Sequence, residues 1–249
     1  MSLREFLERT TLFKGLSPPV VERLVGAAVT YGVARGSTIW RVGEPPQVLS
    51  FVKSGLVKLT RPAPRGRTSL CGLFGAPTVL GELVLVKGVP YQNTAAAATA
   101  NVTLVSIPRD VVLGCMRSEP ELALNLFCAF EDKFKALHDK IDVLSAGSVE
   151  ARLATLLLKL YDQFGDELMD GTLRIGLPLS RQELADIVST SFETAIRVLS
   201  RWEREGIVLT DGDGFTIGDR ALLQTLSGDW GAPERAPASL AAATALSPR

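Results

Sequence analysis

Residues 179–217 read LSRQELADIVSTSFETAIRVLSRWEREGIVLTDGDGFTI, and this stretch decides the fold. Ser180 and Glu183 stand in the S-x-x-E order of a capping box, in which two side chains satisfy free amides at the start of a helix. Gly206 closes a second helix, because glycine tolerates the left-handed backbone that follows a helix end. Two β-prone runs on either side of the turn DGDG at 211–214 predict a hairpin. Together these elements predict a winged helix-turn-helix.

The second helix of such a motif lies in the major groove, with its first turns toward the base edges. Glu193 and Arg197 are four residues apart and therefore lie on one side of this helix. A carboxylate accepts from cytosine N4 and a guanidinium binds guanine O6 and N7, so the pair is suited to reading G·C pairs. The alternative is an ordinary surface ion pair. The residues predicted to read bases are Phe192, Glu193, Ile196 and Arg197, and those predicted to bind phosphates are Ser180, Arg181, Ser191, Thr194 and Arg201.

Charge and composition limit how the chain can bind DNA. The 249 residues include 27 Lys and Arg and 27 Asp and Glu, which gives a net charge of zero. This balance excludes a protein that binds nucleic acid through bulk positive charge, so contacts must be local and depend on a dimer. No segment has the pattern of a secretory signal or a membrane span, and we therefore expect a cytoplasmic protein.

The distribution of apolar, Gly and Pro residues along the chain predicts four segments and an α+β fold. Residues 1–118 open with two short helices and continue as short β-prone runs between Gly- and Pro-bearing turns, which predicts an antiparallel β-roll. Residues 119–147 predict one long helix, because they contain no glycine before their last position. Residues 148–227 hold the winged helix-turn-helix. Residues 228–249 are rich in Ala and Pro and predict a disordered tail.

Apolar residues recur along the predicted long helix in alternating steps of four and three, which is a heptad pattern. A period of 3.5 residues held over three heptads favours pairing with a second copy of the chain, and the alternative is a core helix of the same domain. The residues predicted at the interface of a homodimer are Phe127, Phe130, Phe134, Leu137, Ile141 and Leu144.

The motifs, in this order and at these separations, resemble the CRP/FNR family of transcription factors over about residues 10–226. The resemblance implies a homodimeric regulator that binds a pseudo-palindromic site on double-stranded DNA and that, as an activator, would also contact RNA polymerase. The motifs are GST at 36–38, GEP at 43–45, VKSG at 52–55, LGEL at 80–83, LSRQELA at 179–185 and ETAIR at 193–197.

The resemblance also locates an effector pocket, where this chain departs from the family pattern. Members that bind cyclic nucleotides place an arginine and a Ser or Thr about ten residues after the Gly-Glu of the phosphate-binding cassette. In this chain that count reaches Gln92 and Asn93. Neutral amides cannot replace the charge of arginine, which argues against cAMP. The candidate pocket residues are Gly81, Glu82, Leu83, Gln92, Asn93, Leu137 and His138.

Other sensor chemistries of the family lack ligands in this sequence. No cysteine precedes Cys71, which argues against an N-terminal iron–sulfur cluster. His138 is the one histidine; it could be a haem ligand or a proton switch, but a lone histidine is more often a plain surface or packing residue, so haem is not expected. The three cysteines match no metal-ligand spacing, and their apolar flanks favour burial in the core over a redox role.

No catalytic motif is present in the sequence. There is no P-loop and no G-x-S-x-G elbow, and the single histidine has no nucleophile near it in sequence. The sequence therefore predicts neither an enzyme nor a metal site. The alternative to a DNA-binding regulator is a ligand-binding module whose helical domain binds another protein.

Overall fold

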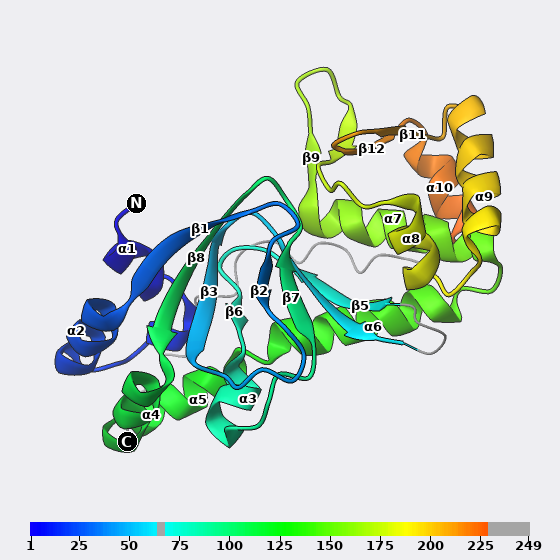
Figure 1. The fold of residues 1–249 in the computed structure, drawn as a ribbon. Helices are drawn as coiled ribbons and strands as arrows, with labels where there is room; N and C mark the ends of the chain where they lie inside the picture. Colours follow the sequence, from blue (N-terminus) through cyan, green and yellow to red (C-terminus); the bar gives the residue numbers. More distant parts are fainter. Residues whose placement is uncertain (64–67, 229–249) are drawn as a thin grey trace, which may run out of the picture.

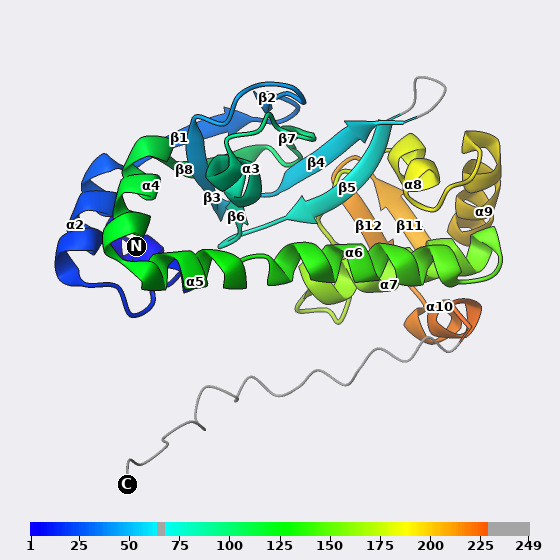
Figure 2. The same cartoon turned by 90° about the horizontal axis from the view of Figure 1, so that it is seen from below.

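The computed structural model of the protein describes residues 1–63 and 68–228 and shows a β-roll, a long helical segment along one side of it, and a C-terminal domain (Figures 1 and 2). Within these residues, no helix is long and apolar enough to cross a membrane. Apart from Gly228, the predicted disordered tail lies outside the described residues.

The β-roll confirms the antiparallel architecture expected from the sequence. The strands of the roll that the structure describes are β1 (Val29–Ala34), β2 (Thr38–Trp40), β3 (Val48–Ser54), β4 (Val57–Pro62), β5 (Thr68–Phe74), β6 (Val79–Leu80), β7 (Thr94–Ala97) and β8 (Asn101–Pro108). They form one sheet in the order β1-β8-β3-β6 and another in the order β2-β7-β4-β5. Successive residues of β3 point to opposite faces, so that Phe51 packs toward the N-terminal helices and Val52 packs inside the roll.

Short helices close one end of the roll (Figure 1). They are α1 (Leu3–Glu8), η1 (Thr11–Phe13), α2 (Pro18–Ala27), α3 (Glu82–Lys87) and α4 (Arg109–Ser118). The predicted pair of N-terminal helices is present, and the first begins with a capping box between Ser2 and Glu5. Phe6, Leu7 and Leu24 pack with Phe51 and Leu85 in one apolar cluster, which fixes these helices on the first sheet.

The segment predicted as one helix over 119–147 consists of α5 (Pro120–Cys128) and α6 (Glu131–Ser145), which run almost in line (Figure 2). Ala129 and Phe130 between them keep right-handed helical angles, but the amide of Phe130 donates to the carbonyl of Phe127 only three residues back, 3.1 Å away. The two halves have different anchors. The side-chain amide of Asn125 holds α5 on the carbonyls of Leu12 and Lys14, whereas α6 packs on β5.

The C-terminal domain confirms the winged helix-turn-helix. Its elements are α7 (Val149–Phe164), β9 (Gly165–Glu167), β10 (Leu173–Ile175), α8 (Arg181–Ile187), α9 (Phe192–Arg204), β11 (Val208–Asp211), β12 (Gly214–Ile217) and α10 (Arg220–Leu226). The predicted capping box of α8 is present, because Ser180 Oγ accepts from Glu183 N at 3.1 Å and Glu183 Oε2 accepts from Ser180 N at 2.9 Å. Gly206 has the expected positive φ of 71°.

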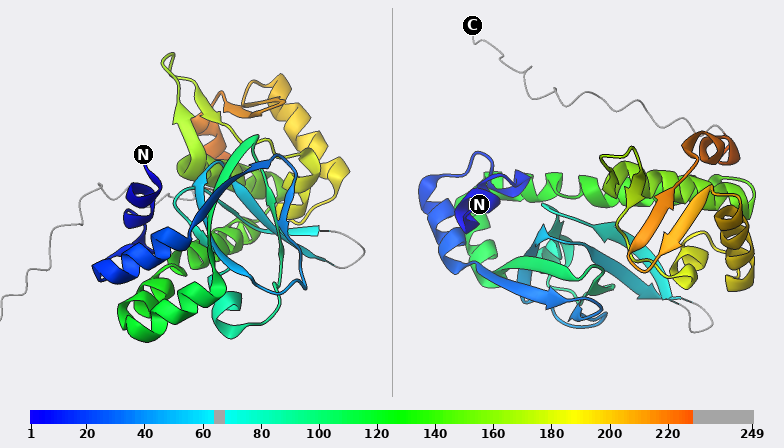
Figure 3. Two further views of the ribbon diagram at one scale, coloured as in Figure 1. Left: turned by 60° about the vertical axis from the view of Figure 1, so that its left-hand side comes forward. Right: turned by 90° about the horizontal axis from the view of Figure 1, so that it is seen from above.

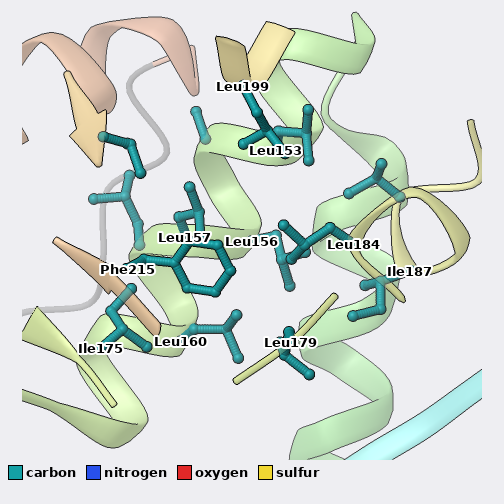
Figure 4. Packing of buried hydrophobic residues seen from close by; sticks show 14 of the residues in the cluster. Leu153, Leu156, Leu157, Leu160, Ile175, Leu179, Leu184, Ile187, Leu199 and Phe215 are labelled. Atoms are coloured by element: carbon teal, nitrogen blue, oxygen red, sulfur yellow. The ribbon is translucent and has the colours of Figure 1, made fainter. Parts of the chain in front are cut away.

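One apolar cluster joins the C-terminal domain to the roll. Leu156, Leu157 and Phe215 lie at its centre (Figure 4). Leu70 and Leu73 of β5 belong to the same cluster, so the second sheet of the roll packs directly on the C-terminal domain. β4 and β5 extend toward α8 in the views of Figure 3. The roll and the helix-turn-helix are therefore packed against each other through apolar side chains.

Candidate nucleic-acid interface and effector pocket

Helix α9 has one buried and one exposed face. Ala195, Leu199 and Trp202 are buried in the core of the C-terminal domain. The four residues predicted to read bases lie off this buried face: Phe192, Glu193 and Arg197 are exposed, and Ile196 is half-buried. No ion pair joins Glu193 to Arg197, both of which the structure describes. Their charged ends are therefore available to a partner of the protein.

The residues predicted to bind phosphates also have roles inside the protein. Ser191 Oγ caps α9 by accepting from the amide of Thr194 at 3.2 Å, and Ser180 caps α8. Arg181 Nη2 lies 3.2 Å from Glu203 Oε2 and so ties α8 to α9. These contacts fix the angle between the two helices of the motif.

Arg201 is held at the other end of α9 by a carboxylate of α7. Its guanidinium pairs with Glu150, which also accepts from the indole Nε1 of Trp202 at 3.1 Å. Of the five residues predicted to bind phosphates, Ser180, Ser191 and Thr194 lie at helix starts, while the two arginines are partly neutralised by Glu203 and Glu150. This surface therefore carries little net positive charge.

The β-roll contains a cavity of about 280 Å³ that faces α6. Five of the predicted pocket residues line it: Gly81, Glu82, Gln92, Asn93 and Leu137. The prediction that His138 lines the pocket is wrong, because this residue is exposed and does not line the cavity. Successive side chains on a helix are turned by about 100°, so His138 points away from the direction of Leu137. Leu83 lies in α3, but its side chain is not among the described parts of the chain.

Sequence reasoning missed the other residues that line the cavity: Trp40, Leu59, Tyr91, Phe130, Lys133 and Phe134. Trp40 and Tyr91 come from segments far apart in the chain, and their rings stack with centroids 4.5 Å apart at an angle of 14°. Lys133 stands between Phe130 and Phe134, but the heptad pattern there predicts contact with a second copy of the chain, so the sequence held no signal that Lys133 faces the roll.

A buried carboxylate and an ammonium group lie side by side at this cavity. Only 4% of Glu82 is exposed, and its Oε1 lies 3.4 Å from Lys133 Nζ. Lys133 also donates to the carbonyl of Val79 and lies over the ring of Phe74, 5.4 Å from its centroid. Helix α6 thus places a cation against the LGEL segment at 80–83.

The polar atoms of Trp40 and Tyr91 and the amide nitrogen of Gln92 form hydrogen bonds within the chain. Trp40 Nε1 donates to the carbonyl of Asn93 at 3.1 Å, and Gln92 Nε2 donates to the carbonyl of Pro90 at 2.9 Å. Burial raises the pKa of Tyr91 to about 12, and its hydroxyl donates to the carbonyl of Val48 at 3.5 Å. Tyr91 therefore stays neutral in the physiological range.

The residues predicted at a dimer interface form an exposed apolar stripe on α5 and α6. Phe127 is 72% exposed, Phe134 59% and Ile141 57%, and Leu137 and Leu144 are also exposed. Phe130 differs: it is half-buried and contributes to the wall of the cavity. The core-helix alternative does not describe this stripe, because the same side chains would then be covered by the chain itself.

The cysteines differ from one another in burial. Cys115 is buried and Cys71 half-buried, and burial raises the pKa of both thiols, which reduces the reactive thiolate. Cys128 is exposed, so the prediction that all three are small buried residues is wrong at that position, where the side chain projects from α5 into solvent. In the part of the chain that the structure describes, no group of three or more His, Cys, Asp or Glu could hold a metal ion.

Comparisons with known proteins agree with both halves of the fold. Residues 32–119 match the model of the cyclic nucleotide-binding domain, and residues 151–226 match that of the Crp-like helix-turn-helix domain. The chain is 29% identical over 219 residues to the CRP-like cAMP-activated global transcriptional regulator of Mycobacterium tuberculosis, covering 88% of this chain and 97% of that protein. It is 30% identical over 196 residues to the global nitrogen regulator of a Synechocystis strain, covering 78% of this chain and 82% of that protein.

A solved structure agrees with this likeness. A transcriptional regulator of the CRP/FNR family from Thermus thermophilus is similar to this chain with a TM-score of 0.65 and 25% sequence identity, over 80% of this chain and 98% of the other. A similar arrangement of domains thus occurs at low sequence identity.

Proposed function

The chain belongs to the CRP/FNR family of DNA-binding transcriptional regulators, which are not enzymes, and on this premise we propose that it acts in the cytoplasm as a homodimer on a pseudo-palindromic operator with G·C pairs in each half-site. The observation that carries the proposal is the exposed first half of α9, where Glu193 and Arg197 lie opposite the buried face of the helix. These side chains have the chemistry to read cytosine and guanine.

The exposed apolar stripe supports the homodimer. A contiguous row of exposed apolar side chains on a monomer is costly in water and marks an interaction surface. The heptad spacing of the stripe suits a second copy of the same helix. Binding to a pseudo-palindromic operator requires that the twofold axis of this homodimer place the two α9 helices about 34 Å apart, one turn of DNA.

The hinge between α6 and α7 supports regulation by movement of the C-terminal domain. Ser148 caps α7 after the predicted break at Gly147, with its Oγ accepting from Ala151 N at 3.1 Å. The guanidinium of Arg152 donates to the carbonyls of Ala146, Gly147 and Val188, and so links the hinge to the end of α8. A shift of α6 relative to α7 would therefore move the helix-turn-helix.

The effector that we propose is not cAMP. The M. tuberculosis relative is described as cAMP-activated, but in this chain Gln92 and Asn93 occupy the place of the phosphate-clamping residues, and neither carries a charge. Their amides can bind neutral polar groups but cannot compensate a phosphate. If the regulator is an activator, RNA polymerase is its further partner.

Two measurements on the full-length protein test this proposal. Light scattering should give twice the mass of the 26.7 kDa chain. Selection from random double-stranded DNA should then enrich a pseudo-palindrome with G·C pairs in each half. A monomer, or binding without sequence preference at moderate salt, would instead favour a ligand-binding module whose helical domain binds protein.

A further inference from the structure

The cavity of the β-roll contains its own counter-ion, and this limits the ligands that it can take. We propose that the cavity binds an uncharged ligand with a flat apolar body and excludes nucleotides that carry a phosphate. The selectivity against phosphates comes from Lys133 of α6, because its ammonium group is already paired with the carboxylate of Glu82. This inference rests on the proposed function only in taking the cavity as the effector site.

The charges of the cavity are already balanced. Among the lining residues that the structure describes, Glu82 is the one acid and Lys133 the one base, and they lie 3.4 Å apart. An anion that enters must either face the carboxylate of Glu82 or draw Lys133 away from it. The second course leaves a buried carboxylate without its counter-charge, which is strongly unfavourable. A neutral ligand meets neither obstacle.

Lys133 is also held by groups other than Glu82. It donates to the carbonyl of Val79 in β6 and lies over the ring of Phe74 at the end of β5. A cation over an aromatic face in a partly buried site is further stabilised there. An entering phosphate would thus compete with Glu82, the carbonyl of Val79 and the ring of Phe74 for the same ammonium group.

The walls of the cavity favour a flat apolar ligand. Trp40 and Tyr91 stack, and the polar atoms of both rings already donate to backbone carbonyls, so the rings offer mainly apolar surface. Leu59 and Phe130 extend this surface. The volume of about 280 Å³ is just below the usual range of small-molecule sites, roughly 300–1,000 Å³, which points to a small ligand of a few fused or linked rings.

The ligand and the second copy of the chain would contact the same side chains. Phe134 and Leu137 line the cavity, and both are also more than half exposed on the apolar stripe. A ligand against their inner surface would therefore change the packing available to a second copy on their outer surface. This gives the ligand a direct route to the dimer helix.

Adenosine and cAMP are suitable probes, because they share base and ribose and differ in the charged cyclic phosphate. Calorimetric titration into the full-length protein should show adenosine binding at least tenfold more tightly than cAMP. Glu82→Gln leaves Lys133 without its carboxylate, so affinity for cAMP should rise at least tenfold while that for adenosine changes less than threefold. Glu131→Gln makes the same chemical change at an exposed position of α6 and should alter neither affinity.

A second variant covers the case in which Glu82→Gln does not fold. Gln92 is exposed, and Gln92→Arg adds a cation at the cavity without touching the Glu82–Lys133 pair; it should also raise affinity for cAMP at least tenfold. The proposal is overturned if the unmodified protein binds cAMP as tightly as adenosine, if it binds neither probe, or if neither folded variant gains affinity for cAMP. Operator selection without any ligand tests the regulator itself, so failure of the two ideas can be told apart.

Discussion

Lys58 in β4 of the roll and Glu183 in α8 of the helix-turn-helix form an ion pair, with Nζ and Oε1 2.5 Å apart. The carboxylate of Glu183 also closes the capping box on Ser180. A single side chain thus fixes the start of α8 and receives a contact from the β-roll, beside the packing of β5 on the C-terminal domain. The position of the helix-turn-helix is therefore sensitive to the position of β4.

Removing this ion pair should loosen the helix-turn-helix from the roll. Both side chains are less than a third exposed, at 28% and 27%, and pairs of this kind contribute about 1 kcal/mol. We expect Lys58→Met to lower the free energy of unfolding by about that amount and to increase amide exchange in α8. Lys53 forms no ion pair among the described residues, and Lys53→Met is the control for loss of a lysine. Equal effects of the two variants would contradict a role for the pair.

The stability that this ion pair contributes should depend on pH. Burial alone would raise the pKa of the Glu183 carboxyl, but hydrogen bonds from Lys58 and Ser180 outweigh it and hold that pKa below its ordinary value of 4.5. A carboxyl with a lowered pKa in the folded state stabilises the fold above its unfolded pKa, and this contribution is lost as the pH falls through the folded pKa. The stability advantage of the unmodified protein over Glu183→Gln should be full at pH 6 and shrink below about pH 4.5.

Urea unfolding of both proteins between pH 6 and pH 3 measures this difference. A gap in unfolding free energy that stays constant over this range would show that Glu183 is not held as a carboxylate by Lys58. Glu167→Gln, at an exposed position of β9, is the matched control, and we expect its gap to stay near zero.

Local signals in the sequence predicted local structure well. The capping box of α8, the glycine after α9 and the cap at Ser148 each depend on residues within a few positions, and all three are present. The break at Ala129 and Phe130 was not predicted, because neither residue interrupts a helix by itself; it lies where α5 and α6 pack on different parts of the roll.

Contacts between distant residues escaped prediction for a physical reason. Lys58 and Glu183 are 125 positions apart, and nothing in the pattern around either residue specifies the other. The stack of Trp40 on Tyr91 and the Glu82–Lys133 pair are of the same kind, since they exist only once the roll has closed and α6 lies against it. The apolar stripe could be predicted because its heptad period is a property of one segment.

A charge in the apolar stripe should separate the two copies of the proposed dimer. Ile141 is 57% exposed in the single chain, so Ile141→Glu costs the monomer little but would bury a carboxylate at the proposed interface. We expect light scattering to show a monomer and operator affinity to fall at least a hundredfold. Lys135→Glu changes an exposed residue of α6 off the heptad pattern and should leave the dimer intact. A dimer that survives Ile141→Glu would place the interface elsewhere.

Arg197 and Arg204 should differ in how they affect recognition of DNA. Both are exposed on α9, but Arg197 lies in the half expected to face base edges, whereas Arg204 is the last residue of the helix. A bidentate contact to guanine contributes about 1–3 kcal/mol of discrimination, so Arg197→Ala should reduce the preference for one G·C position by roughly five- to 150-fold. Arg204→Ala should weaken binding to all sequences about equally, as the loss of a backbone contact does. Binding measured on operators changed one base pair at a time distinguishes the two; a uniform loss with Arg197→Ala would show that this side chain contacts the backbone and does not read a base.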